Sequence, residues 1–319
     1  MSPITVSRAL RNPDMVSDEL RQRIDGAVNK LGYVPNIAAS RLASSRSHAI
    51  GVIVPTLYNV IFAEFLQALH EVLLPVGFQV IVVNSRYSIE EEENAIRTLL
   101  GQRVEAIVIV GVNHSKLARR MLIQSRIPVV EAFQIAPEPI GINVGLDQIQ
   151  AGADATRFLL GHGYRRVGFV LGQRDERAVE RLRGYQLAME EAGLFDENLI
   201  FSQTGTSSIA LGARVMSEIA THAQLPEAVF CIDDNLALGA LQESRRIGLK
   251  VPGDIAILGF HDLEFAACAS PSLSSVATQR YEMGKLAGEY ALRLLNTGKP
   301  GERRTVKLDH SIVRRQSTP

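Results

Sequence analysis

Short apolar runs alternate with amphipathic stretches from about residue 49 to the end of the chain. This alternation is typical of parallel β-sheets covered by helices. Ten runs are strand candidates, and they fall into two successive sets. The first set is Ala49–Val54, Phe78–Val83, Ala106–Val110, Pro128–Glu131 and Ile140–Val144, and the second is Arg166–Leu171, Leu199–Ser202, Ala228–Ile232, Ile255–Gly259 and Ser274–Ala277. Two such sets predict two similar α/β lobes.

The first 47 residues have a helical pattern instead. Ser2-Pro3 is a typical helix start, and Asn12-Pro13 ends the helix predicted from Pro3 to about Leu10. A second helix is predicted to open at Ser17 and to end at Gly32. Its apolar residues have the spacing of one buried face, and they are Leu20, Ile24, Ala27, Val28 and Leu31.

A third helical piece, residues 36–43, is too short to be stable alone, and a polar linker, residues 44–48, follows it. We therefore place a head domain at 1–43 and a core domain at 49–319. The whole chain balances 34 basic against 34 acidic residues, but residues 1–47 have seven basic and four acidic ones. A basic head on a mildly acidic body points weakly to nucleic acid.

Composition excludes several classes of protein. With 46% hydrophobic residues in 319, wholesale disorder is excluded. The longest apolar stretch, Ala106–Val112, is far shorter than the roughly 18 residues of a membrane span. The N-terminus lacks the apolar core of a signal peptide, so a cytoplasmic protein is expected. Cys231 and Cys268 form no CxxC pair, and we expect both thiols to be buried.

Catalytic motifs are absent from the sequence. It contains no GxSxG nucleophile elbow, no Walker-type phosphate loop and no dinucleotide GxGxxG, so we expect no catalytic residue, cofactor or metal. The run Glu90–Glu93 follows Ser88 and is interpreted as the solvated first turn of a helix. Asp233-Asp234 and His261-Asp262 each follow a predicted strand, where ligands bind in open α/β sheets, so these four are site candidates.

Motifs along the whole chain, taken in order, resemble the LacI/GalR family of bacterial transcriptional regulators. Gly161–Val167 (GHGYRRV) resembles the family's GHRRI segment, and Arg181–Tyr185 (RLRGY) resembles its RxxGF. The remaining matches are Ile4–Leu10, Val16-Ser17, Leu31–Asn36 and Ala39–Ala43 in the head, and Asp233–Ala240, Gly248–Ala256 and Gly259–Asp262 in the second lobe. A match of this extent is far more specific than any one motif.

The resemblance implies a two-lobed α/β core of the periplasmic-binding-protein type, with two Rossmann-like parallel sheets, preceded by a partial helix-turn-helix headpiece. The first lobe is expected at about 49–145 and 279–304, and the second at about 146–278 and 305–319.

The resemblance also implies DNA contacts. The first predicted helix would enter the major groove, with Thr5 and Arg8 reaching base edges. Phosphate contacts would come from Ser7, Ser17, Tyr33 and Asn36. In the hinge helix, 36–43, Ala39 and Leu42 would meet the minor groove, with Leu42 as an apolar wedge. The alternatives are an ordinary exposed helix face for Thr5 and Ser7, and a small helical core for Leu42.

The headpiece departs from the family in one respect. Family members have another helix before the recognition helix, whereas this chain starts at the second one, with Met1 in place of the usual valine. We expect a mis-set start or a trimmed chain. Because the recognition helix would then lack its partner, we expect this chain to bind operator DNA poorly and residues 1–45 to be loosely held.

Effector contacts are carried over by position to the cleft between the lobes. They are Asn59, Phe62, Arg177, Arg181, Ser207, Asp233 and His261. His261 replaces an aspartate of many relatives, and with Arg177 and Arg181 it favours an anion over a neutral sugar. The resemblance is greatest to the gluconate-repressor branch, so gluconate or a ketogluconate is the expected effector.

Three of these residues have structural alternatives. Phe62 could be part of the lobe core, Arg181 could form a surface ion pair with Glu180 or Asp175, and His261 could be a buried histidine with satisfied hydrogen bonds.

The expected partners are operator double-stranded DNA, a sugar-type effector, and a second copy of the chain in a homodimer or tetramer. Effector binding would close the lobes and shift the dimer interface of the first lobe, so that the hinge helices pair or separate. Release of DNA is the commoner family behaviour, but recruitment stays open. A solute-binding protein and a sugar-acid enzyme on the same fold remain alternatives.

Overall fold

The computed structural model describes residues 5, 6, 9, 15–33, 46–172, 175–298 and 302–318. The chain divides into two compact units, Met1–Ser47 and His48–Pro319. In the first unit, Thr5, Val6 and Ala9 are helical. Helix α2 spans Asp18–Leu31, with Ser17 at its N-cap and Gly32 in the left-handed conformation after its last turn, as predicted. The predicted hinge helix, 36–43, lies outside the described residues.

The apolar face predicted for α2 is mostly uncovered. Ile24 is its one buried residue, whereas Leu31 is 79% exposed. A unit of fewer than 50 residues buries a small share of its surface, so the spacing of apolar residues overstates the burial here.

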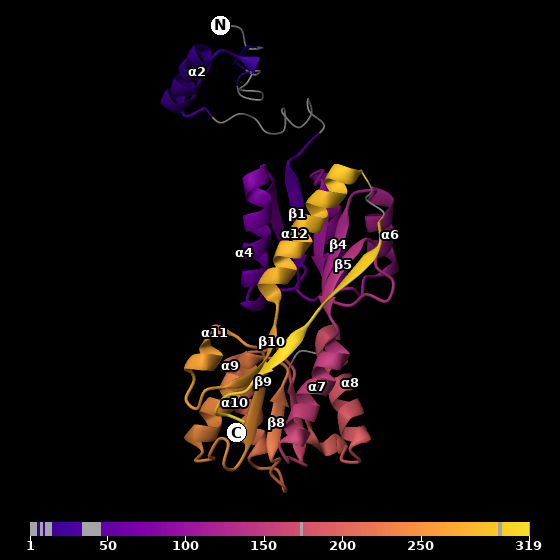
Figure 1. The fold of residues 1–319 in the computed structure, drawn as a ribbon, viewed down its shortest axis with the longest axis vertical. Coiled ribbons are helices and arrows are strands. Elements are labelled where there is room, and N and C mark those ends of the chain that lie inside the picture. Colours follow the sequence, from indigo (N-terminus) through magenta and orange to yellow (C-terminus); the bar gives the residue numbers. More distant parts are fainter. Residues whose placement is uncertain are drawn as a thin grey trace. The chain divides into compact units, whose positions relative to one another are not determined.

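The first lobe of the larger unit is a six-stranded sheet with helices on both faces (Figure 1). Its strand order is β11-β5-β4-β3-β1-β2, and all its pairs are parallel. In chain order its elements are β1 (Ala49–Val54), α4 (Ile61–Leu73), η2 (Leu74–Val76), β2 (Gln79–Asn84), α5 (Ile89–Gly101), β3 (Ala106–Val110), α6 (Lys116–Ser125), β4 (Val129–Gln134), β5 (Ile142–Leu146), α12 (Arg280–Thr297) and β11 (Arg304–Leu308).

The second lobe repeats this arrangement. Its strand order is β12-β10-β9-β8-β6-β7, and only the β10–β12 pair is antiparallel. Its elements are α7 (Gln148–Gly161), β6 (Val167–Leu171), α8 (Glu176–Glu191), η3 (Glu197–Leu199), β7 (Ile200–Ser202), α9 (Ile209–Ile219), β8 (Ala228–Cys231), α10 (Asp234–Arg246), β9 (Ala256–His261), α11 (Glu264–Cys268), β10 (Ser274–Thr278) and β12 (His310–Val313).

All ten predicted strands are confirmed, and their ends are shifted by at most three residues. Strands β11 and β12 were not predicted. Because β11 pairs with β5 of the first sheet and β12 with β10 of the second, the chain returns to the second lobe at Asp309. The expected boundary between the lobes, at about residue 304, is therefore too early in the chain.

Polar residues fix where the helices begin. Side chains of Ser88, Ser115, Asp175 and Asp233 each accept a hydrogen bond from the backbone N–H three residues later. Such N-caps satisfy one of the free amides of a first helical turn. The interpretation of Glu90–Glu93 is half right, because Glu90 and Glu91 are exposed whereas Glu92 and Glu93 bond to His114 and Ser115.

Glycines allow two helices of the second lobe to pack closely. A Cβ atom at Gly239 of α10 would lie 2.0 Å from the carbonyl oxygen of Ile209, and one at Gly212 of α9 would lie 2.1 Å from that of Leu236. Since both obstacles are backbone atoms, no larger residue fits without moving a helix.

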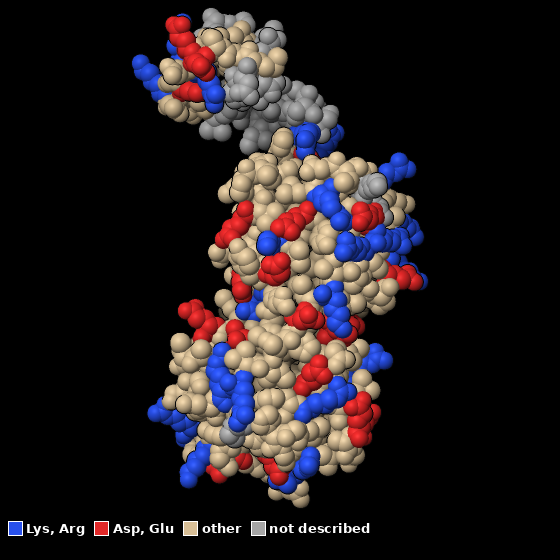
Figure 2. Space-filling view, in the orientation of Figure 1, with Lys and Arg blue, Asp and Glu red and all other residues tan. Residues whose placement is uncertain are grey.

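The expectation that both cysteines are buried is wrong for Cys268, which is exposed, whereas Cys231 is buried. Cys268 ends the short helix α11 at the lobe surface, where few neighbours cover it. Among the described residues, no helix is long and apolar enough to span a membrane. On the visible face of the core unit, basic and acidic residues are interspersed (Figure 2), in line with the balanced charge.

Candidate functional site

Both sheets reverse their strand order at one point, between β1 and β3 in the first and between β6 and β8 in the second. Ligands of open α/β folds bind beyond the carboxyl ends of strands at such points. A cavity of about 30 Å³ lies there, lined by residues of both lobes. Six of the seven predicted effector residues line it, namely Asn59, Arg177, Arg181, Ser207, Asp233 and His261.

Arg177 stands at the N-terminal end of α8, buried to 6% exposure. Its Nη2 donates to Asp175 Oδ2 at 2.8 Å. Its guanidinium lies over the rings of Phe62 and Phe133, at 5.4 and 5.7 Å from their centroids. Burial would raise the pKa of Asp175, but the charge and hydrogen bond of Arg177 outweigh it and lower that pKa. Asp175 is therefore an anion at neutral pH.

Arg181 is one helical turn further along α8 and is 5% exposed. Its Nε donates to Gln148 Oε1 at 2.8 Å and its Nη1 donates to the carbonyl oxygen of Ile232 at 2.6 Å. The guanidinium stacks 3.9 Å from the ring centroid of Phe260. Burial lowers the pKa of Arg181 to about 10, so it keeps its charge at neutral pH. The alternative of a surface ion pair does not describe this buried side chain.

Asp233 is both an N-cap and a lining residue. Its Oδ1 accepts from the backbone N–H of Leu236, which holds the carboxylate at the start of α10. Burial raises the pKa of Asp233, against the lowering effect of its hydrogen bonds, including one from Ser207, and of the Arg181 charge. The site therefore contains a second acceptor whose negative charge is costly to bury.

His261 occupies the position where β9 ends, with φ at +104°, a conformation that residues other than glycine rarely adopt. Its ring Nδ1 lies 3.2 Å from Thr278 Oγ1, and its carbonyl oxygen accepts from Arg280 Nη1. Burial, followed by the charges of Arg181 and Arg280, lowers the pKa of His261 well below its ordinary value. The ring is therefore neutral, and it is both a buried, hydrogen-bonded histidine and a lining residue.

Three other candidates lie elsewhere. Phe62 is 1% exposed and packs in the first-lobe core behind Arg177. Asp234 is buried and accepts from Ser275 Oγ and from the backbone N–H of Leu263, each at 2.6 Å. Asp262 pairs with Arg315 at 2.6 Å. Asp234 and Asp262 therefore anchor the second lobe and do not line the cavity.

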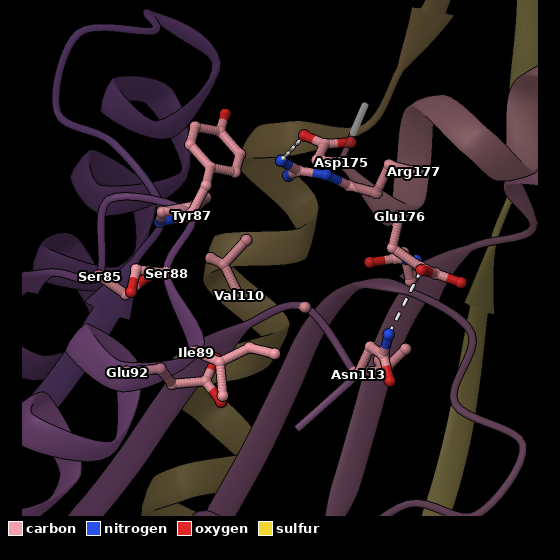
Figure 3. A pocket seen from close by; sticks show the side chains of 14 residues that line it. Ser85, Tyr87, Ser88, Ile89, Glu92, Val110, Asn113, Asp175, Glu176 and Arg177 are labelled. Carbon is pink, nitrogen blue, oxygen red and sulfur yellow. Dashed lines mark hydrogen bonds and ion pairs between the residues drawn. The ribbon is translucent and has the colours of Figure 1, made fainter. Parts of the chain in front are cut away.

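A second cavity, of about 320 Å³, adjoins the first (Figure 3). The ends of β1, β2, β3 and β4 and the start of α8 line it, and it shares Tyr87, Asp175 and Arg177 with the smaller cavity. Its size falls within the range of natural ligand pockets, about 300–1,000 Å³. The smaller cavity alone holds little more than a water molecule.

Tyr87 lines both cavities and was not predicted from the sequence. It follows β2 and has φ at +56°, next to Arg86 at +52°, so two consecutive residues adopt the left-handed conformation. Burial raises the pKa of the Tyr87 phenol, which therefore stays protonated. Its place just beyond a predicted strand was a usable signal, because ligands bind beyond strand ends.

A buried ionic cluster includes Glu92, which also lines the larger cavity. His114 Nδ1 lies 2.9 Å from Glu92 Oε1 and its Nε2 lies 3.5 Å from Glu131 Oε1. Burial lowers the pKa of His114, but the carboxylates of Glu131 and Glu92 that face its ring outweigh this effect and raise the pKa to about 9. The charged imidazole thus joins α5 and the loop before α6 to β4. Neither His114 nor Glu131 was predicted from the sequence to belong to an ionic cluster.

Of the predicted DNA contacts, Thr5 is helical and half-buried, and Ser17 and Tyr33 are exposed, with Tyr33 at 52%. Ser7, Arg8, Asn36, Ala39 and Leu42 lie outside the described residues.

Comparisons with known proteins agree with both units. Residues 1–36 match the family described as bacterial regulatory proteins, lacI family, and residues 156–318 match the periplasmic binding protein-like domain. The chain is 39% identical over its full length to the HTH-type transcriptional regulator GntR of Pseudomonas aeruginosa, and it covers 92% of that protein.

Two solved structures are also similar. One is a LacI-family transcriptional regulator from Silicibacter pomeroyi, with a TM-score of 0.90, 31% identity, and coverage of 100% of this chain and 96% of that one. The other is the transcriptional regulator CelR in complex with cellobiose, with a TM-score of 0.74, 29% identity, and coverage of 98% and 94%.

Proposed function

This chain belongs to the lacI family of bacterial regulatory proteins, and from that premise we propose that it is a cytoplasmic transcriptional regulator whose operator binding responds to a sugar acid held between its lobes. The relatives are named as transcriptional regulators, which favours ligand binding over turnover. CelR, a relative of the same fold, is a regulator in complex with a sugar, which supports a sugar-type effector for this chain.

One observation favours an acid over a neutral sugar. Two guanidinium groups, Arg177 and Arg181, line the same small cavity, and the residue facing them after β9 is the neutral His261. An arginine presents paired N–H donors that match the two oxygens of a carboxylate. Two carboxylates also line this cavity: Asp175, which is paired with Arg177, and Asp233, whose negative charge is unfavourable because burial raises its pKa. Gluconate or a ketogluconate combines the carboxylate with hydroxyls for the polar lining.

The effector acts by preferring one arrangement of the lobes over another. It shifts DNA affinity only by the ratio of its affinities for the two arrangements. Arg280 is placed to sense this motion, because it donates to the His261 carbonyl in the second lobe and pairs with Glu64 of α4 at 2.8 Å. We propose that the working form is a homodimer and that effector binding releases operator DNA.

Titration calorimetry with gluconate, 2-ketogluconate and glucose tests the effector class. Gluconate or 2-ketogluconate should bind at least about tenfold more tightly than glucose, since one charge-assisted hydrogen-bond pair contributes about 1.5–3 kcal/mol. Tighter binding of neutral glucose would overturn the proposal of a sugar acid.

A further inference from the structure

The larger and smaller cavities share three lining residues, Tyr87, Asp175 and Arg177. Arg177 and Asp175 form an ion pair, with 2.8 Å between Nη2 and Oδ2, in the lining of the larger cavity (Figure 3). Both side chains are largely enclosed, at 7% and 21% exposure. As long as this pair stays closed, a molecule the size of a hexose acid has no single space that includes the two arginines.

Arg177 interacts with both Asp175 and the Tyr87 phenol, which leaves one donor nitrogen to account for. Within residues 46–172, 175–298 and 302–318, its Nη1 is buried and has no hydrogen-bond partner. Phe62 and Phe133 lie together on one side of the guanidinium, because their ring centroids are 5.2 Å apart, and Nη2 is bound to Asp175. A carboxylate that is to pair with Nη1 and Nη2 together has to take the Nη2 contact that Asp175 holds. A buried guanidinium with a spare N–H can accommodate a carboxylate by two parallel hydrogen bonds.

The larger cavity is a poor place for a carboxylate. Among the residues that the structure describes, three acidic ones line it, Glu92, Asp175 and Glu176, and one cation, Arg177. Glu92 is paired with His114, whereas the charge of Glu176 has no such partner cation in the lining. Its polar lining also includes Asn113, whose Nδ2 donates to Glu176 Oε2 at 3.3 Å (Figure 3). Carboxylate oxygens accept hydrogen bonds from hydroxyl groups, so this cavity suits a polyhydroxy chain. The anionic end of a sugar acid has to lie on the arginine side.

We propose that Asp175 is an internal competitor for Arg177 that a ligand carboxylate must displace, and that this exchange joins the two cavities into one effector site. The inference rests on the proposed sugar-acid function. A neutral sugar has no charge with which to replace Asp175, so the ion pair discriminates against neutral sugars. It also weakens the binding of the acid, because Arg177 is already paired.

Asp175→Asn tests this with little disturbance of the fold. Asparagine is as good an N-cap as aspartate, so α8 keeps its capping bond to the Ala178 amide. By calorimetry, the variant should bind gluconate about tenfold more tightly than wild type, while glucose binding should change less than about twofold. Asp175→Ser, another good N-cap, should shift gluconate affinity in the same direction.

Glu190→Gln is the matched control. It removes the same charge near the other end of α8, where Glu190 is exposed and lines neither cavity. Its gluconate affinity should change by less than about threefold. Thermal unfolding of each variant, with and without gluconate, checks that the chain is folded when it is titrated.

The outcomes separate the inference from the proposed function. If wild type binds gluconate and both Asp175 variants bind it no more tightly than Glu190→Gln does, the inference is overturned and the proposed function stands. If wild type fails to bind sugar acids but Asp175→Asn binds them, the inference is supported. If neither wild type nor any variant binds a sugar acid, the proposed function fails and the inference fails with it.

Discussion

The two lobes have the same strand order but bring different chemistry to the cleft. Beyond its strands the first lobe presents the neutral side chains of Asn59 and Tyr87 to the smaller cavity. The second lobe presents Arg177, Arg181 and Asp233 from the starts of two helices. The same fold therefore contributes neutral side chains to the smaller cavity from the first lobe and charged side chains from the second.

This division follows from how each side chain is held. Arg181 is fixed by Gln148 and by the Ile232 carbonyl, and Asp233 is fixed as an N-cap. Preorganised charges discriminate between ligands because they lose little freedom on binding. We infer that the second lobe decides which ligand is bound and that the first lobe closes over it.

The largest expected effect is on Arg181. Arg181→Gln should weaken gluconate binding by about a thousandfold, roughly 4 kcal/mol, because the ligand carboxylate would lose a buried charged partner. Calorimetry measures this loss. Arg183→Gln, which removes an exposed charge from the same helix, should change the affinity less than about twofold. Equal losses in the two variants would mean that net charge, and not the fixed fork of Arg181, attracts the ligand.

The first lobe also contains a buried cation, His114, but this residue does not line the smaller cavity. His114 is held between Glu92 and Glu131, and its folded-state pKa of about 9 exceeds the ordinary value of 6.5. A histidine with a raised folded pKa stabilises the fold fully below pH 6.5. That contribution is lost as the pH rises through 9, because the folded state then gives up a proton that it held more tightly.

We therefore expect the free energy of unfolding to fall between pH 6.5 and 9 by an amount on the order of 3 kcal/mol from this one group. His114→Gln should remove most of that fall in urea-unfolding measurements, whereas replacing the exposed His70 by glutamine should leave it in place. A His114→Gln profile parallel to that of wild type would show that the cluster does not bind its proton in this way.

Much of the fold was predictable because buried strands have a continuous apolar pattern. Strands β1 and β3, buried along their whole length, were predicted with the observed bounds. Strands β11 and β12 were missed because they lie at sheet edges and bury little: three residues of β11 (RTVKL) are exposed, and no residue of β12 is fully buried. A strand with one uncovered edge needs few apolar residues, so its pattern is weak.

The site residues were predictable where their position in a sequence motif is enough to identify them. Residues just beyond strands, such as His261, were found from the family resemblance, and the structure brings six of the seven together. The pairing of Arg177 with Asp175, two residues away, was not predicted, because which anion an arginine meets depends on the rotamers of α8. For Phe62 the lobe core was the stated alternative, since an aromatic residue on an amphipathic helix serves equally well in a core.

The smallest expected effect on gluconate affinity is that of replacing Tyr87. It tests whether the neutral side chains of the first lobe contribute little to binding. Tyr87→Phe should weaken gluconate binding by about threefold, because the phenol stays protonated and contributes at most a neutral hydrogen bond. Tyr58→Phe, at a position 76% exposed in the same lobe, should have no measurable effect in the same titration. A hundredfold loss on Tyr87→Phe would place a main determinant of affinity in the first lobe, and the division of roles between the lobes would then be wrong.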